Sequence, residues 1–462
     1  MLGVPHPGAY GLMKRKLTPR QKVDYWMRRY VPRWRRRILF VMGGIVIGVM
    51  AVVMAKLADW SQSLFFAGHA RWPLLPLVLT PAGFAFSAWL TRTYFQGAQG
   101  SGIPQVMAAR KLQDPEARSA LVSIRIALGK IVLLTLGLGV GASAGREGPT
   151  VQVGGSTMYA LARFAPHRQP GLLLAGASAG IAAAFNAPLA GIMFGIEEMS
   201  RSFEAKTSIL VLATVIAAGL TSLFLLGDYT YFGIATGTLE VGWQYLAILL
   251  AGVVGGVLGG VFSRLVVLFS GRLPGRAGNW LVRWPIAFAA ICGLLVALCG
   301  IAADGSVFGT GYEQSKQILS GEAVPHLFAP LKLVATWLSA ISGIPGGIFS
   351  PSLAVGAGLA YNLSPLMPMV PVGVLAVLFM ASYLSGVVQA PLTSAVIVAE
   401  MTNDHALIFP ILLSSLIASG MSRLIMPHGI YHALSQNFTK PAPVPPEPAP
   451  DPEQPPPAKV EA

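Results

Sequence analysis

A succession of long apolar stretches, separated by short polar segments, is the feature that most constrains the fold of this chain. The stretches cover residues 38–54, 73–90, 120–141, 171–199, 209–226, 243–269, 284–302, 327–344, 348–363, 370–401 and 407–426. A helix needs about 20 apolar residues to cross the hydrocarbon core of a membrane. Several stretches are that long, whereas others are shorter or interrupted by glycine and proline, which predicts helices that end part-way through the membrane. We therefore expect an all-α polytopic membrane protein with many tilted, partly non-spanning helices.

The composition excludes most soluble enzymes. Hydrophobic residues make up 54% of the chain and charged residues only 11%, whereas soluble globular proteins have about 25% charged residues. The sequence contains no HExxH, GxxxxGKS or CxxC motif. We therefore expect no enzymatic activity, no cofactor and no metal site.

The positive charge is concentrated at the N-terminus. Residues 1–40 contain eleven lysines and arginines, from Lys14 to Arg37, against one acidic residue, Asp24. Positive charge next to a first span is typical of the cytoplasmic side. Residues 1–37 are therefore predicted to be a cytoplasmic segment that contacts lipid headgroups, and nucleic acid is not an expected partner. At the other end, residues 441–462 contain ten prolines and are predicted to form a disordered tail.

Two short matches indicate an internal duplication. Residues 149–154 (PTVQVG) resemble residues 351–356 (PSLAVG), and residues 186–191 (NAPLAG) resemble residues 389–394 (QAPLTS). Glu197 and Glu400 follow the second pair at matching distances. We expect a first transmembrane repeat at 38–226, a connecting loop at 227–242 and a second repeat at 243–440. Interrupted helices at corresponding positions of two repeats are the best sequence indication of a transport site near the membrane midplane.

Three glycine-rich motifs precede predicted helix starts: GSGIP at 100–104, GREGP at 145–149 and GIPGGIFSP at 343–351. The free amides at a helix N-terminus favour an anion. Ser101 is either an N-cap or a hydroxyl donor to such an anion, and the amides of Ile348 and Phe349 are available as further donors. The residues that shape these loops are Gly100, Gly102, Pro104, Gly145, Arg146, Gly148, Pro149, Gly346 and Gly347.

Three further side chains are candidates for function. Glu147 is either a structural ion-pair partner of Arg146 or a functional carboxylate among apolar segments. Of the adjacent Glu197 and Glu198, one is expected to pair with Arg201 or another base and the other to titrate, although a cytoplasmic helix end is an equal alternative. Tyr431 is either an interfacial tyrosine or a phenol that turns inward and caps an anion path.

Together, the three motifs resemble the CLC family of chloride channels and H+/Cl− antiporters, over roughly residues 35–438. The resemblance implies a homodimer in a bacterial plasma membrane, with both termini cytoplasmic. Each subunit would contain its own pore between two halves of inverted topology. It also implies that Ser101, Tyr431 and the backbone of Ile348 and Phe349 coordinate a central chloride.

The same resemblance assigns the two glutamates. Glu147 matches the gating glutamate of the family, and Glu198 matches the internal proton-transfer glutamate. Channel members carry an apolar residue at the second position, so Glu198 favours an antiporter, with a passive gated channel as the alternative. Similar bacterial exchangers often carry glutamates directly after GSGIP. This chain has Gln105, Val106 and Met107 there, which leaves the intracellular proton route open.

Overall fold

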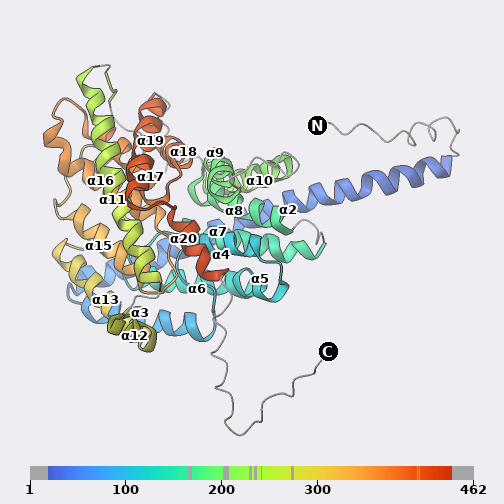
Figure 1. Ribbon diagram of the computed structural model, residues 1–462, viewed down its shortest axis with the longest axis horizontal. Helices are drawn as coiled ribbons and strands as arrows, with labels where there is room; N and C mark the ends of the chain where they lie inside the picture. The colour runs from blue at the N-terminus through green and yellow to red at the C-terminus, as the bar shows by residue number, and fades with distance from the viewer. Residues whose placement is uncertain are drawn as a thin grey trace, which may run out of the picture.

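The computed structural model describes residues 19–164, 169–200, 208–227, 232–233, 237–240, 242–271, 275–402, 404 and 406–439. The described part is built from helices, with two isolated β-bridges and no β-sheet (Figure 1). The all-α prediction is therefore confirmed. Residues 1–18 and the proline-rich segment 441–462 lie outside the described residues.

The helices of the first half begin at the long N-terminal helix and end at residue 226. They are α2 (Pro19–Arg71), α3 (Pro76–Thr93), α4 (Ile103–Lys111), α5 (Pro115–Leu121), α6 (Ile124–Gly139), α7 (Glu147–Leu161), α8 (Gln169–Phe185), α9 (Pro188–Phe194), the π-helix Gly195–Ser200 and α10 (Ser208–Leu226).

The helices of the second half begin at residue 246. They are α11 (Leu246–Ser270), α12 (Gly275–Arg283), α13 (Pro285–Ala302), α14 (Tyr312–Leu319), α15 (Phe328–Ile341), α16 (Phe349–Leu363), α17 (Val372–Val388), α18 (Pro391–Thr402), α19 (Ile408–Ile425) and α20 (Ile430–Ser435). In both halves a 15-residue helix, α7 or α16, is followed by a 17-residue helix, α8 or α17.

Within the described residues, six helical segments are long and apolar enough to cross a membrane. They are Arg37–Arg71, Pro115–Gly139, Ile209–Leu226, Trp243–Ser270, Pro285–Ala302 and Ile408–Ile425. Shorter apolar helices lie among them, and almost every residue of α17 is buried inside the protein. The predicted mixture of spanning and interrupted helices is therefore present.

The apolar stretches at 171–199 and 370–401 are each broken at the same place in the repeat. Asn186 and Gln389 both adopt left-handed backbone conformations, with φ of 54° and 58°. A proline then begins the next helix in each half, Pro188 in α9 and Pro391 in α18. Proline is favoured in the first turn of a helix because its missing N–H would have no partner there. Each stretch is thus divided into a longer and a shorter helix.

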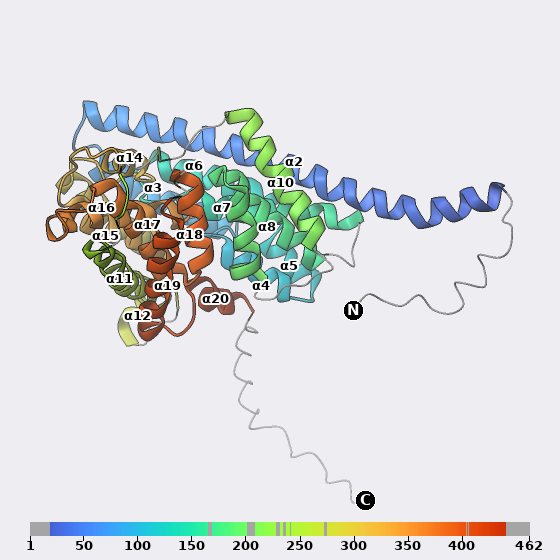
Figure 2. The ribbon, with the colours of Figure 1, turned by 90° about the horizontal axis from the view of Figure 1, so that it is seen from above.

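Helix α2 is much longer than its apolar stretch, which covers only residues 38–54. It continues from the basic segment through Lys56 and Asp59 to Arg71, because neither charged residue interrupts a helix. Its N-terminal part projects away from the rest of the protein (Figures 1 and 2). The basic segment and the first span therefore share one helix.

Glycines allow the central helices to approach closely. A side chain on Gly154 of α7 would collide with the carbonyl oxygen of Gly176 of α8, and the reverse is also true. In the second half, a side chain on Gly259 of α11 would collide with the backbone of Gly386 of α17, and one on Gly386 would collide with the carbonyl oxygen of Gly255. Small residues at such crossings are typical of helix packing in membranes. This packing fixes the starting points of the short helices that form the site.

Candidate functional site

The three glycine-rich motifs meet through backbone hydrogen bonds. Gly145 and Gly347 each donate to the other's carbonyl oxygen, at 2.8 Å in both directions. Gly100 donates to Ile344 at 3.1 Å and accepts from Gly346 at 3.1 Å. These bonds bring the N-termini of α4, α7 and α16 to one place, so the motifs form a single site although they are far apart in sequence.

Glu147 lies at the centre of this site. It is the first residue of α7 and is completely buried. Its Oε1 atom accepts a short hydrogen bond from the hydroxyl of Ser350, and its Oε2 atom accepts from the Ser350 amide at 3.4 Å. The carboxylate therefore occupies the N-terminus of α16, where the helix dipole favours negative charge.

The two glycines beside Glu147 are needed for space. A side chain on Gly145 would collide with the Oε2 atom of Glu147, and one on Gly148 would collide with the hydroxyl of Ser101. Gly102, directly before α4, has a φ of 94°, a conformation that favours glycine. The glycines of the GREGP and GSGIP motifs thus leave room for the side chains of Glu147 and Ser101 where the three helices begin.

Arg146 points away from Glu147. Its Nη1 atom forms an ion pair with Asp59 at 3.0 Å and donates to the carbonyl of Ala55 at 3.3 Å, both on α2. The ion pair found for Arg146 among the described residues is thus with Asp59 and not with Glu147.

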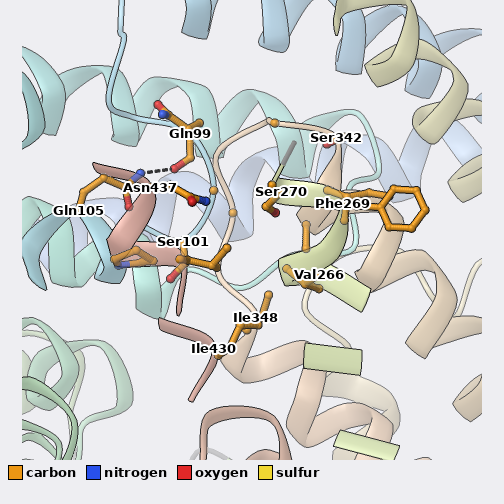
Figure 3. A pocket seen from close by; sticks show the side chains of 18 of the residues that line it. Gln99, Ser101, Gln105, Val266, Phe269, Ser270, Ser342, Ile348, Ile430 and Asn437 are labelled. Carbon is orange, nitrogen blue, oxygen red and sulfur yellow. Dashed lines mark hydrogen bonds between the residues drawn. The ribbon is translucent and has the colours of Figure 1, made fainter. Parts of the chain in front are cut away.

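Ser101 and Tyr431 both line a cavity of about 860 Å³. Figure 3 shows Ser101 in this cavity. Both hydroxyls are buried, and apart from their contact with each other neither has a hydrogen-bond partner among the described residues. The Ser101 hydroxyl is therefore not an N-cap, since no side-chain cap bond is present at the start of α4. Buried hydroxyls without partners are unfavourable, so these two are suited to donate to a ligand.

Ile348 and Phe349 complete the same region. Ile348 precedes α16 and lines the cavity, and Phe349 is the first residue of that helix. No hydrogen bond from either backbone amide to a described residue is present. The Phe349 ring stacks on Tyr431 with a centroid distance of 5.9 Å, which holds the phenol in place. Two backbone amides and two hydroxyls are thus available to one anion.

The adjacent glutamates have different environments. Glu197 accepts hydrogen bonds from the amides of Leu392 and Thr393, at 3.1 and 2.6 Å, and from the Thr393 hydroxyl at 2.7 Å. It therefore caps the N-terminus of α18. Glu198 points to the interior and is only 4% exposed. Arg201, a possible partner from the sequence, lies outside the described residues.

Glu400 makes the matching contact in the second half. Its carboxylate accepts from the amides of Leu189 and Ala190, at 3.1 and 2.7 Å, at the N-terminus of α9. Glu197 and Glu400 thus cap each other's helices across the two halves. The sequence matched the two glutamates by spacing but did not indicate this exchange.

Lys130 is a site residue that sequence reasoning did not assign. It is completely buried in α6, and its Nζ atom donates to the carbonyls of Ala98 and Gly100 at 2.6 and 2.7 Å. It therefore holds the loop that carries Ser101 in place. A lysine in the middle of an apolar stretch was the only signal for this role.

A family model for voltage gated chloride channels matches residues 83–423, most of the chain. The chain belongs to the voltage-gated chloride channel (CLC) family. The H(+)/Cl(-) exchange transporter ClcA of Yersinia pestis bv. Antiqua (strain Angola) is 31% identical over 430 residues, which are 86% of each chain. The ClcA exchange transporter of Klebsiella pneumoniae is 29% identical over 85% of this chain and 86% of its own.

Solved structures of CLC proteins share the fold. A slow cyanobacterial Cl-/H+ antiporter superposes with a TM-score of 0.75 and 25% identity, covering 88% of this chain and 98% of its own. A CLC-type fluoride/proton antiporter gives 0.74 at 21% identity, with 87% and 98% covered. The expected CLC-type fold is therefore confirmed.

The segment after the GSGIP motif departs from the pattern of similar CLC exchangers. Gln105 donates to the carbonyls of Gly97 and Gln99, at 3.3 and 2.6 Å, and so stabilises the loop before α4 (Figure 3). Val106 and Met107 are buried and apolar. None of the three side chains is a carboxylate.

Proposed function

We propose that this CLC protein is a secondary active H+/Cl− antiporter, with one chloride pathway in each subunit. The observation that carries the proposal is the position of Glu147. Its carboxylate accepts hydrogen bonds from the amide and the hydroxyl of Ser350. These donors lie at a helix N-terminus, which would otherwise be available to an anion. Because carboxylate and chloride compete for the same donors, one residue can couple the two ions.

Chloride would bind beside Glu147 without its water shell. Ser101 and Tyr431 would donate their hydroxyls, and Ile348 and Phe349 their backbone amides. Neutral donors of this kind hold an anion firmly enough to select it and weakly enough to release it. The Ser101 hydroxyl matches the chloride-selective pattern of the family.

Glu198 favours exchange over passive conduction. Tyr431 interacts electrostatically with both Glu147 and Glu198, which supports a role for both carboxylates beside the proposed anion site. Glu198 would receive a proton from the inside, and Glu147 would pass it to the outside. The relatives and the most similar solved structure named above are exchangers, which supports an antiporter over a channel.

Chloride-driven proton pumping in proteoliposomes tests this proposal. When the pH is equal on both sides at the start, an outward chloride gradient should drive protons into the vesicles. In addition, the reversal potential should shift when the pH gradient is changed. A chloride current whose reversal potential ignores pH would show a passive channel instead.

We also propose a homodimer in a bacterial inner membrane, with both termini cytoplasmic. Helices α9, α10, α18 and α19 carry many exposed apolar side chains, including Leu189, Ile216, Leu220, Phe224, Leu392, Phe409, Leu413 and Leu416. Helices α9 and α18 have only 7 and 12 residues, which is too short to span a bilayer. Their exposed apolar surfaces are therefore better suited to pack against a second subunit than to face lipid. Light scattering in detergent should give the mass of two chains. Labelling of an engineered cysteine at residue 10 from outside would contradict the orientation.

A further inference from the structure

The loop of residues 307–311 repeats the structure of the loop that carries Ser101. Lys332 follows Lys130 by 202 residues and is buried in α15 as Lys130 is in α6. Each lysine donates to two carbonyls of its own loop: Lys130 to Ala98 and Gly100 at 2.6 and 2.7 Å, and Lys332 to Val307 and Gly309 at 2.9 and 2.7 Å. The two loops are thus held in the same way.

The loops also dock on the rest of the protein in the same way. Gly100 donates to the carbonyl of Ile344, and Gly309 donates to that of Ala142, both at 3.1 Å. The acceptors are again 202 residues apart. The glycines directly before α4 and α14, Gly102 and Gly311, both have positive φ, 94° and 79°. Thr310 therefore holds the position in the second half that Ser101 holds in the first.

Thr310 lines a separate cavity of about 460 Å³, which shares no lining residue with the cavity at Ser101. The residue is only 8% exposed, and its hydroxyl makes no hydrogen bond to any described residue. The N-terminal residues of α14 line the same cavity. Thr310 is thus a largely buried residue that faces the cavity beside a helix N-terminus, and a hydroxyl donor in such a place is suited to an anion.

We propose that Thr310 and the N-terminus of α14 form a second chloride site, at the opposite mouth of the pathway from Ser101. The site is distinct from the position that the Glu147 carboxylate occupies. The inference rests on the proposed function, because this site would bind the transported chloride outside the region that Glu147 closes.

The charges around this cavity indicate weak binding. Arg146 and Lys56 line it together with Asp59 and Glu313, and Arg146 is paired with Asp59. The formal charges of these four side chains cancel, so the hydroxyl and the helix amides would decide the affinity. Weak binding suits an ion that must move on to the next site.

Anomalous diffraction from crystals grown in bromide tests occupancy directly. The wild-type protein should show one bromide within hydrogen-bond distance of Thr310 and another near Ser101. Thr310→Val should lose the first and keep the second, and Thr310→Ser should restore it. A wild-type crystal with bromide near Ser101 but none near Thr310 would overturn the proposal.

Tracer chloride exchange in proteoliposomes, with equal chloride on both sides, tests the role in transport. Thr310→Val should raise the half-saturating chloride concentration about twofold to tenfold, the loss of one hydrogen bond. Glu313→Gln should lower it, and a damaged fold cannot produce that gain. Thr135→Val is the matched control, because the Thr135 hydroxyl bonds its own helix at Ile131.

Three negative results have different meanings. Bromide near Thr310 with an unchanged half-saturating concentration in Thr310→Val would show an adventitious ion only and overturn the proposal. A folded wild-type protein that exchanges no chloride would overturn the proposed function, and this site with it. A wild type that exchanges chloride normally, with no effect of either variant, overturns the second site alone.

Discussion

The hydroxyl of Ser350 donates a hydrogen bond to the Oε1 atom of Glu147, although the two residues are 203 positions apart in sequence. Each lies in the first turn of its helix, α7 or α16, and both side chains are buried. A hydrogen bond to an ionised group contributes about 1.5–3 kcal/mol. Ser350 therefore holds the Glu147 carboxylate in the position that excludes an anion.

Ser350→Ala should weaken this closed position. The carboxylate loses its hydroxyl donor, so chloride displaces it more readily. We expect chloride flux at neutral pH to rise severalfold and to fall less steeply as the pH is raised. Flux in proteoliposomes across a pH series measures both effects. Ser352→Ala is the control, because Ser352 is buried on the same helix and its hydroxyl has no partner among the described residues. An identical pH profile in both variants would contradict this role of Ser350.

The helix starts of the site were predictable from local sequence. Proline in the first turn and glycine before it placed the starts near Pro104, Pro149 and Pro351. The helices begin within two residues of those positions, at Ile103, Glu147 and Phe349. The signal is local because it depends on missing backbone donors and on positive φ, which a few residues determine.

The contacts between the two halves were not predictable from one sequence. The bond from Ser350 to Glu147 and the exchange of caps by Glu197 and Glu400 each join residues about 200 positions apart. Spacing revealed that the halves correspond, but it did not reveal which helix start each carboxylate faces. That depends on how the halves pack, and packing is a property of the whole fold.

Ser101→Pro tests whether this hydroxyl selects the anion. Proline removes the donor and changes the backbone of the loop, so nitrate should gain on chloride in relative permeability. Removal of one hydrogen bond predicts a loss of chloride affinity of about twofold to tenfold. Reversal potentials in mixed chloride and nitrate solutions measure the ratio. An unchanged ratio would show that Ser101 has only a structural role.

The adjacent glutamates should respond differently to substitution. Glu198→Val should leave chloride flux but abolish coupled proton movement. Glu197→Gln should preserve coupling but lower stability by about 1–3 kcal/mol, because the charged cap of α18 becomes neutral. Proton pumping and thermal unfolding separate the two effects. If Glu198→Val still pumped protons, another group would have to carry them.

Glu147 gives the most decisive test. Its ionised carboxylate occupies donors that would otherwise hold chloride, and its protonated form loses most of that attraction and can move aside. Glu147→Gln imitates the neutral form, and Glu147→Ala removes the side chain that closes the path. Both variants should carry chloride with little pH dependence and without proton coupling. If the carboxylate had only a structural role, both variants should misfold or lose all flux. The reason is that removing one partner of a buried pair costs about 3–5 kcal/mol. Thermal unfolding separates these cases, and a well-folded Glu147→Ala protein that still pumps protons would refute the gating role.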